Sequence, residues 1–229
     1  MPDLPKTLVA RFPQLRSHCQ LTWSFYAELA RRCSLFKTAW YSIRFHGAVV
    51  VGRGSKIRVH RHACIAMAPK SLLAIGMAHD TPTGALLRMR SGSNLRVDGR
   101  VQIMRASSIV IGYNAKLSVG AGTFFNDGSS VICSSATTIG PGCAISWGVR
   151  ILDTDIHKLV RDGHATQHAP VRIGRDCWIG TNALVMKGAD LGDGSVVAAG
   201  AVVTAKVPPR SLVAGVPARV MRENVTWEF

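Results

Sequence analysis

The chain has 229 residues, 47% of them hydrophobic and 18% charged, so it can bury a sizeable core and does not have the composition of a disordered segment. Its formal net charge of +15 indicates an anionic partner, such as a phosphorylated cofactor, an acidic glycan, nucleic acid or a membrane surface. The six cysteines form no C-x-x-C pair, and charged residues interrupt the N-terminus where a secretory signal would be apolar. We therefore expect a cytoplasmic protein with reduced thiols.

Residues 1–46 form an N-terminal segment that we expect to be helical, basic and amphipathic. Apolar residues at helical spacing predict one face of a helix, at Leu21, Phe25, Leu29 and Cys33. Positive charge accompanies them at Arg31, Arg32, Lys37 and Arg44. Such a helix binds the inner face of an anionic membrane in one interpretation. In the other it packs on the structure that follows and caps an exposed edge.

From residue 47 to residue 223 the chain shows a repeat of six residues. The spacing begins at Val51 and Ile57 and blurs between residues 67 and 87. It continues at Val119, Phe125 and Val131, resumes after two extra residues at Ile139, Ile145 and Ile151, and is found again at Ile173, Ile179, Val185, Leu191, Val197 and Val203. Neither a helix nor an alternating strand has this period, whereas a short strand followed by a tight turn does. We predict an all-β solenoid over residues 47–223, with three repeats in each coil and a short tail at residues 224–229.

The repeat is interrupted between Ile151 and Ile173, and we predict a catalytic loop at residues 152–170. Asp153, Asp155 and His157 alternate in the sequence DTDIH, and His164 and His168 follow. An imidazole is suited to general base catalysis near neutral pH, and a neighbouring carboxylate can orient it. The sequence does not choose between Asp153 and Asp155. The histidines lack the spacing of a metal site, so no metal is predicted.

The run IGRDCWIGTNALVMKGADLGDGSVVAAGAVVTAKVPPRSLVAGVPARVMRE resembles the C-terminal half of the hexapeptide-repeat acyltransferases. The resemblance is clear from Leu95 to Glu223 and weaker from Gly47 to Asn94. It implies a left-handed parallel β-helix, a homotrimer with active sites shared by adjacent subunits, and acetyl-CoA as donor. His157 occupies the position of the family's catalytic histidine, which implies that it is the general base.

The resemblance also implies residues that contact the two substrates. In GTFFNDGSSV it assigns Asn126 to the acceptor pocket, and in DCWIG it places Trp178 near the donor or the acceptor. Trp147 lies at the mouth of the loop, where it can present a flat face to a sugar ring. Structural alternatives are a turn position for Asn126 and edge packing for Trp178. The implied donor-binding residues are Gly180, Thr181, Ala199, Thr204, Lys206 and Arg219, with the lysine one position later than in the family pattern.

The expected acceptor is a hydroxyl of a sugar or polysaccharide precursor. The basic N-terminal segment and the DTDIH motif resemble O-acetyltransferases of sugars and exported polysaccharides, which implies a hydroxyl of a small molecule or glycan precursor. The alternative enzyme is an N-acetyltransferase of an amino sugar, a nucleotide sugar or an antibiotic. An alternative of another class is a non-enzymatic solenoid scaffold or anion-binding protein. No nucleic-acid partner is expected, because the basic residues form no recognised motif.

Overall fold

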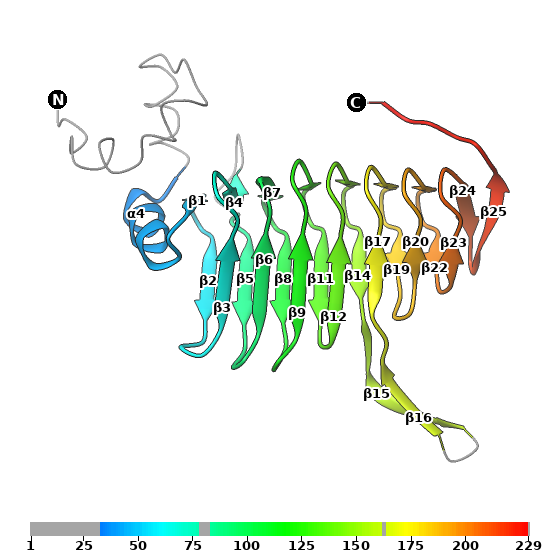
Figure 1. The fold of residues 1–229 in the computed structure, drawn as a ribbon, viewed down its shortest axis with the longest axis horizontal. Helices are drawn as coiled ribbons and strands as arrows, with labels where there is room; N and C mark the ends of the chain where they lie inside the picture. Colours follow the sequence, from blue (N-terminus) through cyan, green and yellow to red (C-terminus); the bar gives the residue numbers. More distant parts are fainter. Residues whose placement is uncertain (1–32, 78–82, 162–163, 229) are drawn as a thin grey trace.

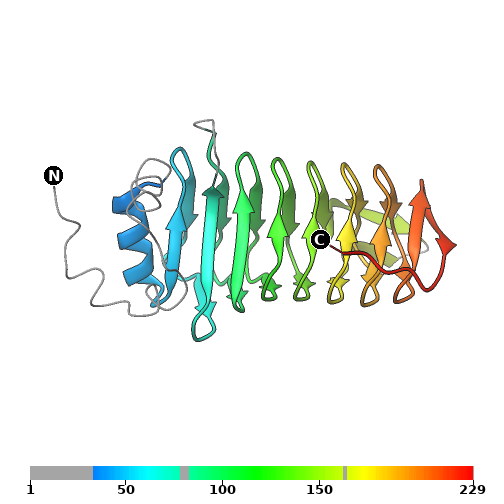
Figure 2. The ribbon, with the colours of Figure 1, turned by 90° about the horizontal axis from the view of Figure 1, so that it is seen from above.

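The computed structural model describes residues 33–77, 83–161 and 164–228. Within these ranges one helix, α4 (Leu35–Arg44), precedes three mostly parallel sheets that wind into a left-handed β-helix with the shape of a triangular prism (Figures 1 and 2). The chain contributes one strand to each sheet in turn, and each coil stacks on the one before it.

Each sheet is named after its first strand. The β1 sheet contains β1 (Ala48–Val51), β4 (Leu72–Met77), β7 (Arg100–Met104), β10 (Phe124–Phe125), β13 (Ala144–Ile145), β18 (Trp178–Ile179), β21 (Val196–Val197), β24 (Leu212–Gly215) and the antiparallel β25 (Ala218–Arg222). The β2 sheet contains β2 (Lys56–Val59), β5 (Leu86–Met89), β8 (Ser108–Ile111), β11 (Ser130–Cys133), β14 (Arg150–Leu152), β19 (Leu184–Val185) and β22 (Val202–Val203). The β3 sheet contains β3 (Cys64–Met67), β6 (Asn94–Val97), β9 (Lys116–Val119), β12 (Ala136–Ile139), β17 (Val171–Ile173), β20 (Asp190–Leu191) and β23 (Lys206–Val207).

The six-residue repeat corresponds to one buried residue on each face of the prism. Ile173 lies in the β3 sheet, Ile179 in the β1 sheet and Val185 in the β2 sheet, and each is at most 1% exposed. Successive coils place the next members of the repeat directly against these, as Ile179 pairs with Val197. The predicted left-handed β-helix is therefore confirmed. Between residues 67 and 87 the repeat blurs because β4 is six residues long and a long connection follows it.

The chain turns at three edges, which we name the β1–β2, β2–β3 and β3–β1 edges after the sheets they join. At the β1–β2 edge the third turn residue has a positive φ in successive coils, at Gly128, Gly148, Asn182 and Gly200. Glycine and asparagine adopt this conformation most readily. Glycine and asparagine therefore allow the chain to turn sharply at this edge.

Helix α4 closes the N-terminal end of the solenoid. Strand β1 is an edge strand, and its outward N–H groups at Val49 and Val51 donate to the hydroxyls of Ser42 and Thr38, each at 3.0 Å. An uncovered edge strand would leave these N–H groups without acceptors. The two hydroxyls of α4 therefore complete the hydrogen bonding of the first coil. This is the capping role considered from the sequence.

The predicted helical face is corrected at Cys33. This residue forms an isolated antiparallel bridge with Gly52, and Ser34 N–H donates to the Val51 carbonyl at 2.7 Å. Pairing with the end of β1 keeps the backbone extended here, so the helix begins only at Leu35. Leu21, Phe25 and Leu29, with Arg31 and Arg32, lie outside the described residues.

The C-terminal residues fold back along the solenoid (Figures 1 and 2). Beyond β25, Val225 N–H donates to the Arg210 carbonyl at 2.9 Å. The indole N–H of Trp227 donates to the Asp176 carbonyl at 2.7 Å, although the two residues are 51 positions apart. The tail is thereby fixed to the β3–β1 edge of two earlier coils.

Cysteine reactivity is expected to follow burial. Burial, together with the Asp153 carboxylate, raises the pKa of the Cys133 thiol to about 12, and this side chain is 0% exposed. Cys64 is exposed on β3. Because the thiolate is the reactive form, we expect Ellman's reagent at neutral pH to modify Cys64 quickly and Cys133 only upon unfolding. Peptide mass spectrometry checks this, and rapid labelling of Cys133 in the folded protein would contradict the structure.

Candidate active site

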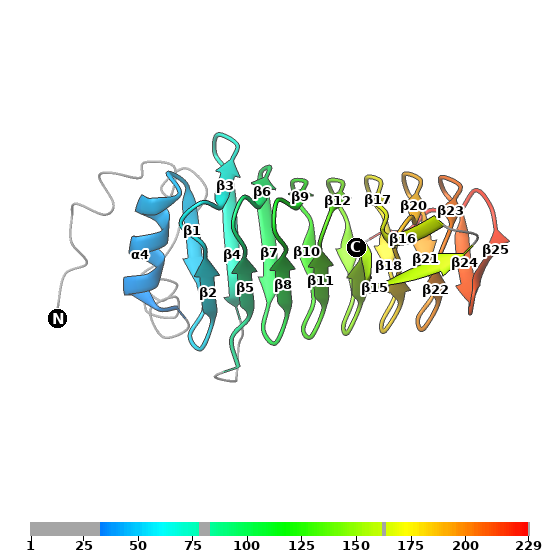
Figure 3. The same ribbon diagram turned by 90° about the horizontal axis from the view of Figure 1, so that it is seen from below.

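The segment predicted as a catalytic loop is a β-hairpin. Strands β15 (Thr154–Arg161) and β16 (His164–His168) pair antiparallel and project from the β2–β3 edge, between β14 and β17 (Figures 1 and 3). The solenoid is not disturbed by this insertion, since β12 pairs with β17 and β14 with β19 in register. The hairpin is thus a separate element attached to a regular prism.

Asp153 anchors the base of the hairpin. Its side chain is 0% exposed, and its carboxylate accepts hydrogen bonds from the backbone N–H groups of Ser134 at 2.6 Å and Ser135 at 2.8 Å. Its own carbonyl accepts from Ala169 N–H at 3.0 Å, which joins the two ends of the insertion. The structure therefore places the Asp153 carboxylate against the preceding coil.

Asp155 faces a different partner, Lys187 of the next coil. The ammonium of Lys187 lies 2.6 Å from the Asp155 carboxylate, and the two side chains are 17% and 31% exposed. The same ammonium donates to the Thr166 carbonyl on β16 at 3.2 Å. One lysine therefore holds both strands of the hairpin, a role that no sequence pattern indicated.

His157 lies on β15 with an exposed side chain. None of the described residues forms a hydrogen bond or ion pair with its ring. The preceding residue, Ile156, has a φ of 65°, which is strained for a β-branched side chain, and the strand register shifts between Thr154 and Leu159. Irregularities of this kind redirect side chains beside active sites. The direction of the His157 side chain is thus set by an irregular backbone and not by the alternation of a regular strand.

A row of predicted substrate-binding residues follows the β1–β2 edge. Register along the β1 sheet aligns the turns after β10, β13, β18 and β21. Asn126, Trp147, Thr181 and Ala199 occupy these turns, and Gly180 precedes Thr181. Trp147 is 56% exposed, and the Asn126 carbonyl accepts from the Ser107 hydroxyl at 3.0 Å. The structure brings these five residues together on one edge, one coil after another.

Trp178 adjoins this row and contacts the C-terminal tail. Its indole N–H donates to the Ser146 hydroxyl at 3.1 Å, next to Trp147, and 42% of the residue is exposed. The ring of Trp227 lies 6.1 Å from the Trp178 ring, centre to centre. Trp227 could not be predicted to lie here, because only the path of the tail brings it next to Trp178.

Comparison with known proteins agrees with this architecture. A family model described as the hexapeptide repeat of succinyl-transferase matches residues 170–205. Galactoside O-acetyltransferase of Escherichia coli K12 is 31% identical over 117 residues, which cover 50% of this chain and 58% of that protein. The chain is therefore similar to the hexapeptide-repeat acyltransferases.

Other relatives extend the comparison. The putative colanic acid biosynthesis acetyltransferase WcaF of Escherichia coli K12 is 34% identical over 126 residues, covering 53% of this chain and 66% of that protein. The chain thus matches less than two thirds of the length of either curated acetyltransferase. The crystal structure of the polySia specific acetyltransferase NeuO aligns with a TM-score of 0.54 at 22% identity, covering 77% of this chain and 89% of the other. At that identity the likeness shows the fold.

The remaining residues predicted to bind the donor lie on other parts of the prism. Thr204 follows β22 at the β2–β3 edge, and Lys206 begins β23. Lys206 lines a cavity of about 270 Å³ on the β3 sheet with Arg172, Asp190 and Asp193. Arg219 lies on β25 opposite Ala214. One chain therefore does not gather all six predicted residues around a single groove.

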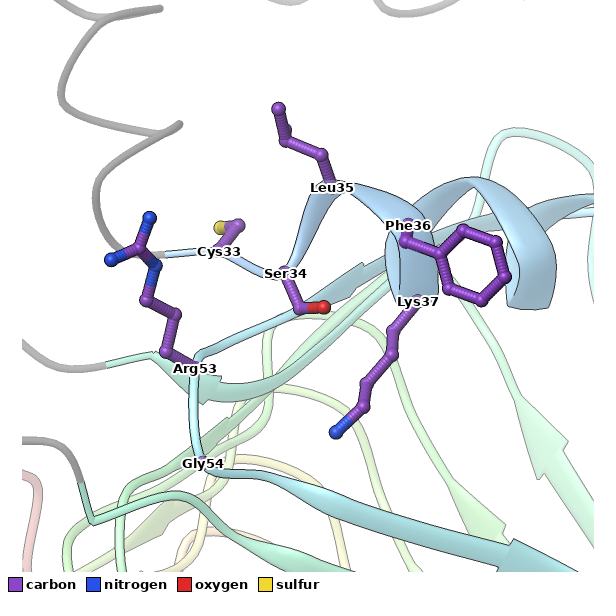
Figure 4. A pocket seen from close by; sticks show the side chains of 7 residues that line it. All are labelled: Cys33, Ser34, Leu35, Phe36, Lys37, Arg53 and Gly54. Carbon is purple, nitrogen blue, oxygen red and sulfur yellow. The ribbon is translucent and has the colours of Figure 1, made fainter.

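Neither of two cavities formed by described residues includes His157. A larger one, of about 430 Å³, lies at the start of α4 and is lined by Cys33, Ser34, Leu35, Phe36, Lys37, Arg53 and Gly54 (Figure 4). Among the described residues, no three His, Cys, Asp or Glu side chains are grouped to hold a metal ion. His60 and His62 contact each other edge to face, with ring centres 5.3 Å apart.

The hairpin that carries His157 is expected to be held in place by Lys187. Lys187→Met removes the contact with Asp155 and Thr166, so amide exchange in β15 and β16 should accelerate about two- to five-fold. Asp155→Asn should accelerate it less, because the bond to Thr166 remains. Hydrogen-exchange mass spectrometry measures both, with Lys116→Met on β9 as the control. Unchanged exchange in the hairpin would show that Lys187 does not anchor it.

Proposed function

We propose that the protein transfers an acetyl group from acetyl-CoA to a hydroxyl of a sugar or polysaccharide precursor. The observation that carries the proposal is His157, presented on a strained hairpin that leaves an otherwise regular solenoid. The names of the curated relatives, a galactoside O-acetyltransferase and a putative colanic acid biosynthesis acetyltransferase, support a sugar hydroxyl as acceptor.

In this mechanism His157 acts as general base. Acetyl-CoA, when bound, supplies the acetyl group as an activated thioester. His157 takes the proton of the acceptor hydroxyl as its oxygen attacks and returns that proton to the leaving sulfur. Asn126, Trp147 and Trp178 hold the sugar, by hydrogen bonding and by ring stacking. Gly180, Thr181, Ala199, Thr204, Lys206 and Arg219 hold the donor.

The contacts of Asp153 and Asp155 indicate which carboxylate can orient the imidazole of His157. Asp155 is the better candidate, because it is partly exposed on the same strand as His157, whereas the Asp153 carboxylate is occupied by two backbone N–H groups. In this proposal Asp155 holds the imidazole of His157. Asp153 would act indirectly, by fixing the base of the hairpin.

The test is acetyl transfer to a panel of acceptors. Purified protein is mixed with acetyl-CoA and with galactosides, acidic oligosaccharides and amino sugars, and CoA release is followed by chromatography. Mild alkali removes an O-acetyl group and leaves an N-acetyl group, so the product distinguishes the proposal from N-acetylation. Absence of both CoA binding and transfer would favour a scaffold or anion-binding protein.

We also propose that the active unit is a homotrimer. His157 lies on the hairpin of the β2–β3 edge, whereas Asn126, Trp147, Thr181 and Ala199 line the β1–β2 edge. A three-fold ring joins two different surfaces of each chain, so one edge can meet the other edge of its neighbour. The hairpin residues Ile156 and Val160 are 59% and 65% exposed, which supports burial against another chain.

Light scattering under assay conditions should therefore give three chains per particle. Mixed trimers provide a sharper test, because His157→Ala and Asn126→Ala damage different edges. If a site combines edges of two chains, co-expression of the two inactive variants restores up to about a quarter of the sites. If both residues serve a site within one chain, mixing restores nothing. An active monomer would refute the proposal.

A cytoplasmic location at the inner face of the membrane completes the proposal. The five cysteines within the described ranges are free thiols, which supports a reducing compartment. In those ranges no helix is long and apolar enough to cross a membrane.

A further inference from the structure

Helix α4 is oriented with its polar face inward. Thr38 and Ser42 bind β1, the Tyr41 hydroxyl donates to the Ile57 carbonyl at 3.1 Å, and the Lys37 ammonium donates to the Ser55 carbonyl at 2.8 Å. These side chains are polar, so hydrogen bonding rather than apolar burial fixes the helix to the first coil. A helix that only capped the solenoid would bury its apolar side instead.

The apolar side of α4 faces away from the prism. Phe36, Trp40 and Ile43 are spaced at i, i+4 and i+7 and are 80%, 55% and 55% exposed, and Leu35 is 48% exposed. Figure 4 shows Leu35 and Phe36 pointing away from the coil, while Lys37 points toward it. A contiguous apolar stripe of this kind marks an interaction surface.

The coils beside α4 carry positive charge with almost no compensation. Residues 33–97 contain ten basic residues and one acidic residue, Asp80. The basic residues are Lys37, Arg44, Arg53, Lys56, Arg58, Arg61, Lys70, Arg88, Arg90 and Arg96. Residues 98–229 balance better, with thirteen basic and ten acidic residues. The charge of the chain is therefore concentrated at the end of the solenoid that α4 closes.

Part of this charge lies on the β2 sheet, next to the helix. Lys56 and Arg58 are exposed on β2, and Arg58 lies beside Arg88 of β5 in register. Within the described part of the chain, no acidic side chain pairs with Lys56, Arg58 or Arg88. Since neighbouring strands are about 4.8 Å apart, both strands lie within about one Debye length of a surface that α4 touches.

We propose that α4 and the first two coils form a surface that binds an anionic membrane. The Phe36, Trp40 and Ile43 side chains enter the interface between headgroups and acyl chains, and Lys56, Arg58 and Arg88 contact anionic headgroups. A bilayer surface offers an apolar layer for the Phe36, Trp40 and Ile43 stripe. It also offers negative charge for the basic side chains of β2 and β5.

Other occupants fit less well. An acidic glycan or a nucleic acid would match the cations but leave the apolar stripe in water. A second copy of the chain would bring equal positive charges together. The chain's own residues 1–32 carry five basic and two acidic residues, so they have the same sign as the surface.

Vesicle flotation with the full chain tests the proposal independently of acetyl transfer. We expect binding to phosphatidylglycerol vesicles that weakens with added salt, and little binding to phosphatidylcholine vesicles. Phe36→Glu/Trp40→Glu should abolish binding. Arg58→Gln/Arg88→Gln should weaken it roughly five-fold for each cation removed. Met221→Glu on β25 at the far end and Arg172→Gln on β17 in a later coil are controls of the same residue kinds, and they should bind as the unmodified chain does.

Three results would overturn the proposal. The first is the absence of binding to phosphatidylglycerol vesicles. The second is binding that Phe36→Glu/Trp40→Glu leaves unchanged, since this would show that another segment carries it. The third is a loss of oligomeric state on light scattering of Phe36→Glu/Trp40→Glu, because it would show that a second copy covers α4.

Discussion

Replacing His157 with alanine is expected to lower acetyl transfer about 10²–10⁴-fold at saturating acceptor, the usual contribution of a general base. Donor affinity should change little, because none of the six residues proposed to hold the donor lies on the hairpin. The measurement is turnover by CoA release, with donor affinity from calorimetry on the same variant. A loss confined to turnover would agree with a role in the chemical step.

The hairpin offers controls of the same residue type. His168 is exposed at the end of β16, and His164 lies opposite Arg161 at the other end of the strand. His164→Ala and His168→Ala are expected to change turnover only mildly. Should His157→Ala retain near-normal turnover while one of these variants loses it, the base has been assigned to the wrong histidine. If none of the three matters, acetyl transfer by this mechanism is excluded.

Asp153→Ala is expected to destabilise the fold by about 3 kcal/mol or more. The substitution leaves the Ser134 and Ser135 N–H groups without an acceptor in a buried position, and an unpaired buried polar group costs about 1–3 kcal/mol. Loss of a charge-assisted acceptor adds to this cost. Urea unfolding followed by circular dichroism gives the free energy of unfolding.

A second variant separates the structural role from a catalytic one. Asp155→Ala removes a partly exposed carboxylate and should destabilise the fold by about 1 kcal/mol or less. If Asp153→Ala instead keeps the stability of the unmodified chain and loses only turnover, the carboxylate acts in catalysis. The Asp153 assignment as an anchor would then be wrong.

The fold could be predicted because its signal is repeated many times. Each six-residue unit has an apolar residue at the same position. An irregular stretch in one coil, as between residues 67 and 87, therefore does not hide the repeat. The end of the N-terminal segment was less predictable. Cys33 fits the helical spacing, but pairing with the open strand β1 decides its conformation, and that edge exists only in the folded chain.

Residues of the candidate site could be predicted only where the residue type itself indicates a chemical role. His157 stands out as a titratable residue in a gap of the repeat, and the resemblance to the family adds its role. Lys187 does not stand out, because its contact with Asp155 depends on how the hairpin leans on the next coil. Trp227 reaches Trp178 only through the returning tail. The division between Asp153 and Asp155 likewise depends on backbone groups of an earlier coil.

The coils of the prism do not depend on the hairpin for their pairing. Ala169 N–H and the Asp153 carbonyl close the gap, and the strands on either side keep their register as though no residues had been added. Length and sequence between these two residues can therefore vary during evolution at little cost to the folding of the coils. Related chains can thus differ in the length of the hairpin around the position of His157 while the coils keep the same register.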